Sequence, residues 1–591
     1  MTTGRYLALV GRNQNDRERV SALGKRATQL SKLEVIAADD GFLLLADADM
    51  RVSNFGNHRG AILGTIFERD GCARSATIAG EPAIDSIVAS GGRSLATHYW
   101  GGYVAILWAA SDHRCDIIRD PSGFLPCYHT ELQGITAIAS DVRLLTTIES
   151  AEIGVDWSAL HRHLYLPELR GAETCLTGVR ELLRGDQLTL TSDTKQITQI
   201  WSPWTFAVPS DRITEYRHAT EALASTLRLC VSAWAHDFDH ILLGMSGGLD
   251  SSIVASCLRQ AGAAFTCHTI STRDPVGDER SYARSLAAAL EVPLIEHWYD
   301  IAHIDITRSD GKNYPRPVSR VFAQSLGTLS MEAASEVGSD AFFSGGGGDN
   351  VFSLQRSAAP LADHYLTEGF LAARESLRNL CDLTDCSILE AIGQGGRFAS
   401  KRNHAYRWNV DPSFLSRSHE HAPERNNHAW LDLPDWGLPG KARHIAMILR
   451  FQNHLEGHRH AEMAPKIAPL MSQPVIELCL RIPSWCWWRD GLDRSVARHA
   501  FADSLPADII ARRSKGSPDS FAIEIYQYFR PMIREMLNGG LLAAHQLLDL
   551  ASLNHVLDGP ERVSGPHYSR ILSLVDAEAW ARCWYERRPS L

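Results

Sequence analysis

The chain has 591 residues, of which 45% are hydrophobic and 22% are charged, and its formal net charge is −10. This length predicts two or more domains, and the composition excludes a disordered chain. The acidic balance argues against a nucleic-acid partner, because proteins that bind nucleic acids concentrate Lys and Arg against phosphates. No apolar run approaches the roughly 20 residues of a membrane span. We therefore expect a cytoplasmic protein that is not membrane-spanning.

Residues 1–205 predict a predominantly β domain, because short apolar segments alternate with Gly, Asp and Asn. The first segment, Tyr6 to Val10, lacks the longer apolar core of a secretory signal and is expected to be a strand. Further strands are expected at Gly41 to Leu45, Tyr103 to Trp108 and Ile135 to Ala139. The stretch from Ile200 to Pro209, with two tryptophans and two prolines, interrupts this pattern. We therefore place a second domain at residues 206–591.

The second domain begins with alternating helical and strand patterns, which predict a doubly wound parallel sheet. Helices are expected at Glu215 to Ala235, Asp278 to Leu290 and Phe322 to Val337. Strands are expected at His240 to Met245, Phe265 to Ile270, Pro293 to His297 and Asp340 to Phe343. A polar insert with two prolines occupies Ser309 to Pro317, and the remainder to Leu591 is expected to be mainly helical.

A glycine-rich segment between an apolar strand and a helix carries the strongest functional signal. It reads Ser246-Gly247-Gly248-Leu249-Asp250-Ser251-Ser252. A strand that enters such a turn and then a helix directs backbone N–H groups at one point and predicts an anion site. Asp250 suits such a site if it binds Mg²⁺ beside phosphate oxygens. The alternative is a Ser/Gly turn that merely caps a helix. The GxxxxGK[ST] pattern is absent, which disfavours γ-phosphate transfer.

A second glycine-rich turn, Ser344 to Asp349, follows the strand predicted at Asp340 to Phe343. Ligands of open α/β sheets bind at the carboxyl ends of strands. Asp349 could therefore supply a second carboxylate to the same Mg²⁺. A flexible glycine linker is the alternative, but linkers seldom lie between a buried strand and an apolar pair such as Val351 and Phe352.

These motifs resemble those of the asparagine synthetase superfamily, and the resemblance extends over nearly the whole chain. The segments that carry it are Arg119 to Gly123 with Pro126 and Tyr128, Ala139 to Asp141, Glu173 to Gly178, Arg184 to Asp186, the two glycine-rich turns, Asp278 to Ala283 and Leu505 to Lys515. The resemblance implies an N-terminal Ntn-hydrolase-like αββα domain of the class II glutamine amidotransferase type. It implies, in addition, a C-terminal adenine nucleotide α-hydrolase-like (PP-loop) domain with a helical C-terminus.

The resemblance also implies roles for individual residues, with ATP and Mg²⁺ as cofactors. Asp250 and Asp349 would bind Mg²⁺, and Ser246 to Ser252 would bind the pyrophosphate of ATP. Ser344 and Gly345 would lie near AMP, with Ser271 near the adenine. Lys515 would contact the α-phosphate, where a fixed cation stabilises charge that grows in the transition state. Without the resemblance, a solvated surface lysine would be the simpler interpretation of Lys515.

Three positions depart from the family pattern. Residue 2 is Thr where glutamine-dependent members carry a cysteine nucleophile, so the first domain is expected to be a catalytically silent scaffold. Gly346 stands where asparagine synthetases carry Glu and where β-lactam synthetases carry a catalytic tyrosine. Asn350 replaces an acidic residue. We expect Gly346 to enlarge the acceptor side of the site for a bulky peptide.

This combination looks most like the lasso peptide cyclases, which are macrolactam synthetases. The implied substrate is a precursor peptide, and the implied candidate partners are a leader peptidase and a leader-binding protein. A β-lactam synthetase, an ammonia-dependent asparagine synthetase-like ligase and a non-catalytic scaffold remain as alternatives. A tRNA-modifying ATP-pyrophosphatase would need a basic face or cysteine chemistry that the sequence lacks.

Three further groups of residues favour structural roles. The twelve cysteines form no CxxC pair and predict buried, reduced thiols. His454, His458 and His460 with Glu456 lack the HExxH spacing, so a metal site there is disfavoured. Trp485, Trp487 and Trp488 could line a peptide groove, but a partly buried aromatic cluster is the favoured interpretation.

Overall fold

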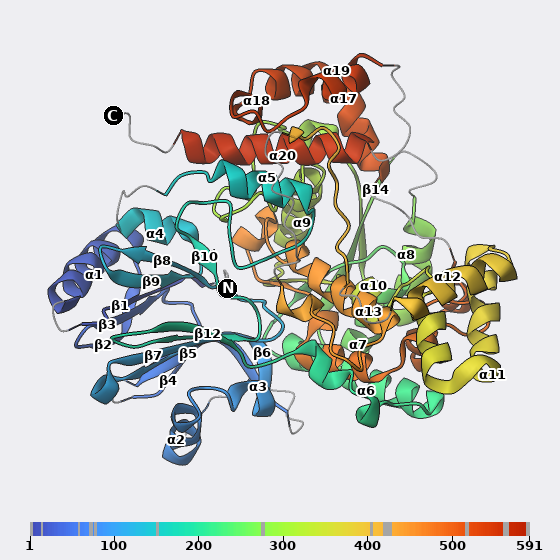
Figure 1. Cartoon of the computed structure of the whole chain (residues 1–591), viewed down its shortest axis with the longest axis horizontal. Helices are drawn as coiled ribbons and strands as arrows, with labels where there is room; N and C mark the ends of the chain where they lie inside the picture. The colour runs from blue at the N-terminus through green and yellow to red at the C-terminus, as the bar shows by residue number, and fades with distance from the viewer. Residues whose placement is uncertain are drawn as a thin grey trace.

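The computed structural model describes most of the chain. The described residues are 4–13, 16–56, 59–69, 75, 78, 80–148, 153–272, 278–401, 406–417, 428–513, 519–559 and 567–586. Figure 1 shows the first third of the chain on the left and the remainder on the right, with the C-terminal helices at the top. Within the described part, no helix combines the length and hydropathy that crossing a bilayer requires.

The first third contains two six-stranded sheets, in which all strand pairs are antiparallel. One sheet has the order β10 (Arg180–Glu181), β8 (Tyr128–Leu132), β9 (Ile135–Ala139), β1 (Tyr6–Val10), β3 (Phe42–Ala46), β2 (Glu34–Asp39). The other has the order β12 (Lys195–Gln199), β11 (Asp186–Leu190), β7 (Arg114–Arg119), β6 (Tyr99–Ala109), β5 (Gly60–Glu68), β4 (Val52–Asn54). The strands expected from the apolar segments are all present.

Helices cover the outer faces of these two sheets. An apolar core that includes Tyr6 and Trp108 fills the space between the sheets. A second core joins α1 (Arg17–Ser31) and α4 (Val142–Ile148) to the first sheet, and a third joins α2 (Glu81–Ala89) and α3 (Leu95–His98) to the second. The order of layers is therefore helix, sheet, sheet, helix, as expected for an αββα domain.

The rest of the chain is organised around a five-stranded parallel sheet. Its order is β15 (Leu294–Trp298), β14 (Phe265–Ser271), β13 (Ile241–Gly244), β16 (Ala341–Ser344), β17 (Lys466–Ile467). The chain adds strands on one side of β13 and then crosses to the other side. The point between β13 and β16 is therefore a topological switch point, where α/β sheets bind ligands. Four of these strands were predicted, and β17 was not.

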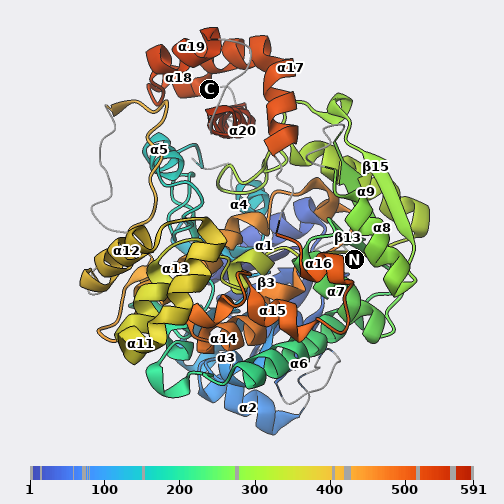
Figure 2. The same ribbon diagram turned by 90° about the vertical axis from the view of Figure 1, so that its right-hand side faces the viewer.

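Helices surround this sheet (Figure 2). The first four are α6 (Tyr216–Ala235), α7 (Leu249–Gln260), α8 (Arg280–Leu290) and α9 (Ala323–Val337). After β16 follow α10 (Gly348–Val351), α11 (Ala359–Thr384), α12 (Ile388–Ser400), α13 (Pro439–Arg450), α14 (Gln473–Arg481), α15 (Ser495–Ala500), α16 (Ala507–Ile510), α17 (Asp519–Asn538), α18 (Leu541–Ala544), α19 (Leu550–Asp558) and α20 (His567–Tyr585). The prediction of a mainly helical remainder is confirmed. The domain boundary at residues 205 and 206 stays a prediction.

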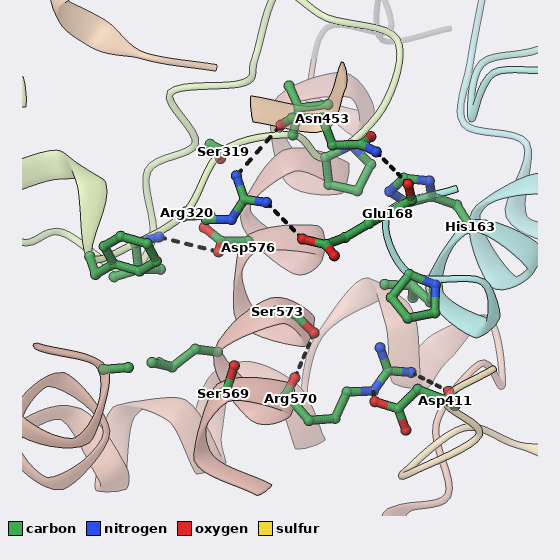
Figure 3. A pocket seen from close by; sticks show the side chains of 18 residues that line it. His163, Glu168, Ser319, Arg320, Asp411, Asn453, Ser569, Arg570, Ser573 and Asp576 are labelled. Carbon is green, nitrogen blue, oxygen red and sulfur yellow. Dashed lines mark hydrogen bonds and ion pairs between the residues drawn. The ribbon is translucent and has the colours of Figure 1, made fainter. Parts of the chain in front are cut away.

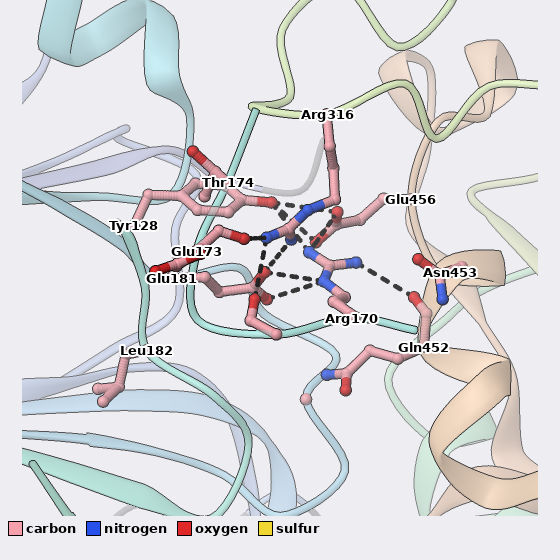
Figure 4. A network of polar contacts seen from close by, with 12 residues as sticks. Tyr128, Arg170, Glu173, Thr174, Glu181, Leu182, Arg316, Gln452, Asn453 and Glu456 are labelled. Atoms are coloured by element: carbon pink, nitrogen blue, oxygen red, sulfur yellow. Dashed lines mark hydrogen bonds and ion pairs between the residues drawn. The ribbon is translucent and has the colours of Figure 1, made fainter. Parts of the chain in front are cut away.

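A buried polar network joins the two parts of the chain (Figure 4). Glu181 is fully buried and accepts hydrogen bonds from Arg119 at 2.6 Å, from Arg170 at 2.8 Å and from Arg316. Arg170 also donates to Glu456 at 2.7 Å. Burial alone would raise the pKa of Glu181, but the three guanidinium groups hold it well below its usual value. Because Arg316 and Glu456 belong to the second part, the network fixes the two parts against each other.

Candidate active site

The two glycine-rich turns leave neighbouring strands at the same level. Gly244, the last residue of β13, pairs with Ser344, the last residue of β16. The first turn leads into α7 and the second into α10. Both turns therefore lie at the carboxyl edge of the sheet, on the two sides of the switch point, as the sequence predicts.

The glycines let the two turns pack directly on each other. A Cβ atom on Gly345 would lie 2.4 Å from the backbone nitrogen of Ser251, and one on Gly348 would lie 2.3 Å from Cγ of Asp250. Gly247 has a φ of +64°, and a Cβ atom there would lie 2.4 Å from Cβ of Tyr282. A side chain at Gly345 or Gly348 would separate the turns, and one at Gly247 would displace Tyr282 of α8, so these glycines are a packing requirement.

The serine hydroxyls of the first turn hold its backbone. Ser246 Oγ accepts from the N–H of Gly248 at 3.3 Å, while Ser251 and Ser252 donate to the carbonyl of Gly248 at 3.2 and 2.8 Å. Gly248 is the N-cap of α7 and carries no side chain to cap it. The first N–H groups of α7 are therefore oriented as donors for an anion.

Asp250 and Asp349 converge on one cation. The Nη1 atom of Arg494 donates to Oδ1 of Asp250 at 3.1 Å and to Oδ1 of Asp349 at 2.6 Å. Burial alone would lower the pKa of Arg494, but these two carboxylates and Asp493 hold it above its usual value. Because both carboxylates contact the same nitrogen, they are close enough to bind one metal ion. Hard carboxylate oxygens beside a phosphate-binding turn suit Mg²⁺.

Two more arginines lie beside this pair. Arg494, Arg498 and Arg512 line one cavity of about 380 Å³ together with Ser246, Gly248, Asp250, Ser251, Ser344 and Gly345. Arg512 donates to the carbonyl of Gly247 at 3.1 Å and to Glu279. The cavity thus combines helix N–H groups, carboxylates and three guanidinium groups, which is a donor set for a metal-bound polyphosphate.

Sequence reasoning missed these arginines. They follow the parallel sheet by many residues, and no local pattern connects Arg494 or Arg498 to the glycine-rich turns. The sequence offered a signal for Arg512 alone, because this residue lies in the segment from Leu505 to Lys515 that carries part of the family resemblance. Lys515 itself lies outside the described residues.

Ser271 is not one of the described residues that line this cavity. It is the last residue of β14, is buried, and donates to Asp278 at 3.3 Å. His268, Thr269 and Ile270 of the same strand line the cavity instead. The proximity of Ser271 to adenine stays a prediction.

The space beside Gly346 is partly filled. A Cβ atom on Gly346 would lie 3.0 Å from Cζ of Phe451, and the Phe451 ring is stacked on His454 with ring centroids 5.7 Å apart. The absence of a side chain at Gly346 therefore accommodates an aromatic ring, which differs from the simple enlargement expected from sequence. Asn350 donates to the carbonyl of Met447 in α13 at 2.6 Å and so fixes the second turn to that helix.

The histidine and tryptophan clusters make contacts within the fold. Glu456 binds Arg170, and His454 pairs with Glu168 at 3.3 Å. No group of three or more His, Cys, Asp and Glu side chains suited to a metal ion occurs among the described residues. Trp485, Trp487 and Trp488 are buried, which fits the favoured aromatic cluster but exceeds the partial burial expected from sequence. The described cysteines are free thiols and most are buried, while Cys72 lies outside the described residues.

The motif residues of the first third stabilise its interior. Asp120 accepts from the N–H groups of Ser122 and Gly123, both at 2.8 Å, and Arg119 donates to Glu181. Residue Thr2 lies outside the described residues. The expected silent scaffold therefore stays a prediction that rests on the residue type at position 2.

Comparison with known proteins gives two family matches. Residues 222–582 match the family model described as asparagine synthase, and residues 81–201 match the one described as a glutamine amidotransferase domain. No curated protein matches the chain.

Two solved structures share weak similarity with the chain. A glutamine phosphoribosylpyrophosphate amidotransferase from B. subtilis, complexed with ADP and GMP, is 11% identical over 46% of this chain and 67% of its own, with a TM-score of 0.21. A structure described as the allosteric regulatory enzyme of purine biosynthesis is 9% identical over 50% of this chain and 80% of its own, with a TM-score of 0.20. Similarities this weak carry no argument.

Proposed function

The chain belongs to the asparagine synthase family, and on that premise we propose that this ATP-dependent amide ligase is a lasso peptide cyclase. In the proposed reaction, a side-chain carboxylate of Asp or Glu in a precursor peptide attacks the α-phosphorus of ATP. Pyrophosphate leaves, and an acyl adenylate forms. The N-terminal α-amine of the same peptide then attacks the acyl carbon, AMP leaves, and a macrolactam ring closes.

The observation that carries the proposal is the convergence of Asp250 and Asp349 on Arg494 at the switch point of the sheet. A transferred γ-phosphate would call for a Walker-type lysine in the first turn, which has none. Two carboxylates beside a phosphate-binding helix N-terminus instead support cleavage between the α- and β-phosphorus. Magnesium, when bound by Asp250 and Asp349, would supply positive charge for the departing pyrophosphate.

The protein's own groups would orient and stabilise the reactants. The N–H groups at the start of α7 and the guanidinium groups of Arg494, Arg498 and Arg512 would hold the phosphates in fixed positions. Holding the amine against the acyl group would make its attack intramolecular, which can lower an activation barrier by up to about 7 to 11 kcal/mol. The unperturbed pKa of an α-amine is about 8, so a strong general base is not required.

The acceptor side supports an intramolecular amine over ammonia. Residue 2 is Thr and not the cysteine that would release ammonia from glutamine. Gly346 offers no carboxylate or phenol, and the atom nearest to a Cβ at this position belongs to the apolar ring of Phe451. A substrate that brings its own amine needs neither group.

The test is a reaction of the full chain with ATP, Mg²⁺ and a library of synthetic peptides that have a free N-terminal amine and one Asp or Glu. Mass spectrometry should detect AMP and a peptide lighter by one water. Asp250→Ala should abolish both products, whereas Asp503→Ala, a change at an exposed acid outside the site, should not. Product formed with ADP, or without consumption of nucleotide, contradicts the proposal.

The same assay separates the alternatives. Asparagine formed from aspartate and ammonia would indicate an asparagine synthetase-like ligase, and closure of a four-membered ring would indicate a β-lactam synthetase. Absence of nucleotide turnover under all conditions would indicate a scaffold. A leader peptidase and a leader-binding protein are part of the proposal as partners, so the assay is repeated with candidate partners added.

A further inference from the structure

A second cavity lies where the two parts of the chain meet the C-terminal helices (Figure 3). It has a volume of about 410 Å³ and is here called the outer cavity. Its walls come from six places. These are α5 (Trp157–Tyr165) with the loop after it, the segment 317–322, Asp411, Asn453, Ala522 of α17, and one face of α20. A cavity of this size falls in the range that holds small ligands or a few residues of a peptide.

The outer cavity lies next to the cavity at the glycine-rich turns. Phe322 lines the outer cavity, and Leu326 and Ser330 line the other. Phe322, Leu326 and Ser330 follow one another at intervals of four residues. They therefore lie along one helical face that begins just before α9, and each interval covers about 6 Å along the helix. Phe322, Leu326 and Ile270 belong to the same apolar cluster. The outer cavity therefore reaches the start of α9 at Phe322, and the face of α9 that follows lines the other cavity.

The two arginines of the outer cavity are already paired with carboxylates. Arg320 pairs with Glu168 at 3.4 Å, and Arg570 pairs with Asp411 at 3.4 Å. Although burial would raise the pKa of Glu168, His454 and nearby arginines hold it at about 2. Burial lowers the pKa of His163 to about 3 and keeps its ring neutral. The cavity consequently suits an uncharged polar ligand better than an ion.

One buried carboxyl group that lines the outer cavity has an oxygen without a hydrogen-bond partner among the described residues. Asp576 is 7% exposed, and its Oδ2 atom accepts from the N–H of Val321 at 3.2 Å. Its Oδ1 atom is buried and has no hydrogen-bond partner among the described residues. Such an unsatisfied oxygen bears a desolvation penalty that a hydrogen-bond donor or acceptor on a ligand would relieve. An amide group of a ligand would satisfy it, by its N–H if the carboxyl is ionised or by its C=O if it is protonated.

We propose that the outer cavity binds a segment of the peptide substrate that flanks the reacting carboxylate, through backbone amide groups that include one bonded to Asp576. This inference rests on the proposed function, because it assigns the peptide a path along α9 to the site of adenylation. The same inference assigns a role in peptide binding to the first third of the chain. His163, Leu164 and Glu168 form part of the peptide-binding wall, and Arg316, anchored on Glu181, holds the adjoining segment 317–322.

The test uses the full chain and two measurements. Retention of the synthetic peptide library is measured by ultrafiltration and mass spectrometry, and the affinity for ATP with Mg²⁺ is measured by calorimetry. Ser569→Trp would place an indole in the cavity from an exposed position on α20. Ser552→Trp, at an exposed position on α19, is the matched control. Asp576→Asn provides a second variant, because it keeps the shape of the side chain.

We expect Ser569→Trp to reduce peptide retention at least tenfold while the affinity for ATP is unchanged, and Ser552→Trp to change neither. Asp576→Asn should alter which peptides are retained without altering nucleotide binding. A wild-type protein that retains no peptide, or a Ser569→Trp variant that retains peptides as the wild type does, overturns the inference. Peptide retention without formation of AMP would instead contradict the proposed function and leave the cavity assignment standing.

Discussion

Arg494 donates a hydrogen bond of 2.6 Å to Asp349, although the two residues lie in segments far apart in the sequence. The same Nη1 atom donates to Asp250, so one guanidinium partly neutralises the two carboxylates of the site. A metal ion bound between these carboxylates would take over part of that neutralisation. Arg494 and a divalent cation are therefore expected to substitute for each other electrostatically.

Removal of this arginine should make the stability of the fold dependent on Mg²⁺. In Arg494→Ala two nearby carboxylates lose their shared cation, and the free energy of unfolding should fall by about 3 kcal/mol without metal. Millimolar Mg²⁺ should restore much of the loss. Urea denaturation with and without Mg²⁺ measures this effect. Arg498→Ala, which breaks a pair with Asp493, should be destabilised to the same degree in both conditions.

The close packing of the two turns predicts a strong effect of small substitutions. Gly348→Ala would place a methyl group 2.3 Å from Cγ of Asp250, so the turns must separate. We expect a loss of about 1 to 3 kcal/mol in stability and about 100-fold in the rate of AMP release. Gly393→Ala in α12 is the control, because nothing lies within 4 Å of the position that its new methyl group would occupy. An active Gly348→Ala variant would contradict the assignment of Asp250.

The buried network around Glu181 predicts that its removal destabilises the fold more than removal of an exposed glutamate. In Glu181→Ala the side chains of Arg119, Arg170 and Arg316 lose their common partner, at an expected cost of about 3 to 5 kcal/mol. Glu131→Ala removes an exposed pair with Lys195 and should cost about 1 kcal/mol or less. Equilibrium denaturation of both variants measures the difference. Equal losses would show that the network does not hold the two parts together.

Sequence patterns predicted both turns and eight of the strands, namely β1, β3, β6, β9 and β13 to β16, because each depends on local apolar runs and glycines. They did not predict β17, since two residues, Lys466 and Ile467, carry no periodicity. Arg494 was missed for another reason. Its position between Asp250 and Asp349 results from the packing of a distant loop against the carboxyl edge of the sheet. The ring beside Gly346 comes from Phe451, again a contact that only tertiary structure creates.

Asp576 predicts a particular pH dependence of stability. Burial is the largest cause that raises its pKa well above the usual value, while the N–H of Val321 and Arg320 act in the opposite direction. The folded state then binds more protons than the unfolded state above pH 3.8, so this group's contribution to stability falls as the pH rises. Asp576→Asn should lack this decline. Denaturation of both proteins between pH 5 and pH 9 tests the sign, and parallel profiles would contradict it.

The contact between Gly346 and Phe451 predicts coupled effects on catalysis. In Gly346→Ala the new methyl group would lie 3.0 Å from the Phe451 ring, which must shift and disturb the turn that carries Asp349. We expect a slower release of AMP with wild-type-like stability. In a Phe451→Leu background the smaller side chain makes room, so the same Gly346→Ala change should cost less. A double-mutant cycle on the rate of AMP release should therefore give an interaction energy of about 0.5 to 3 kcal/mol. Additive effects would show that Phe451 does not determine which side chains position 346 accepts.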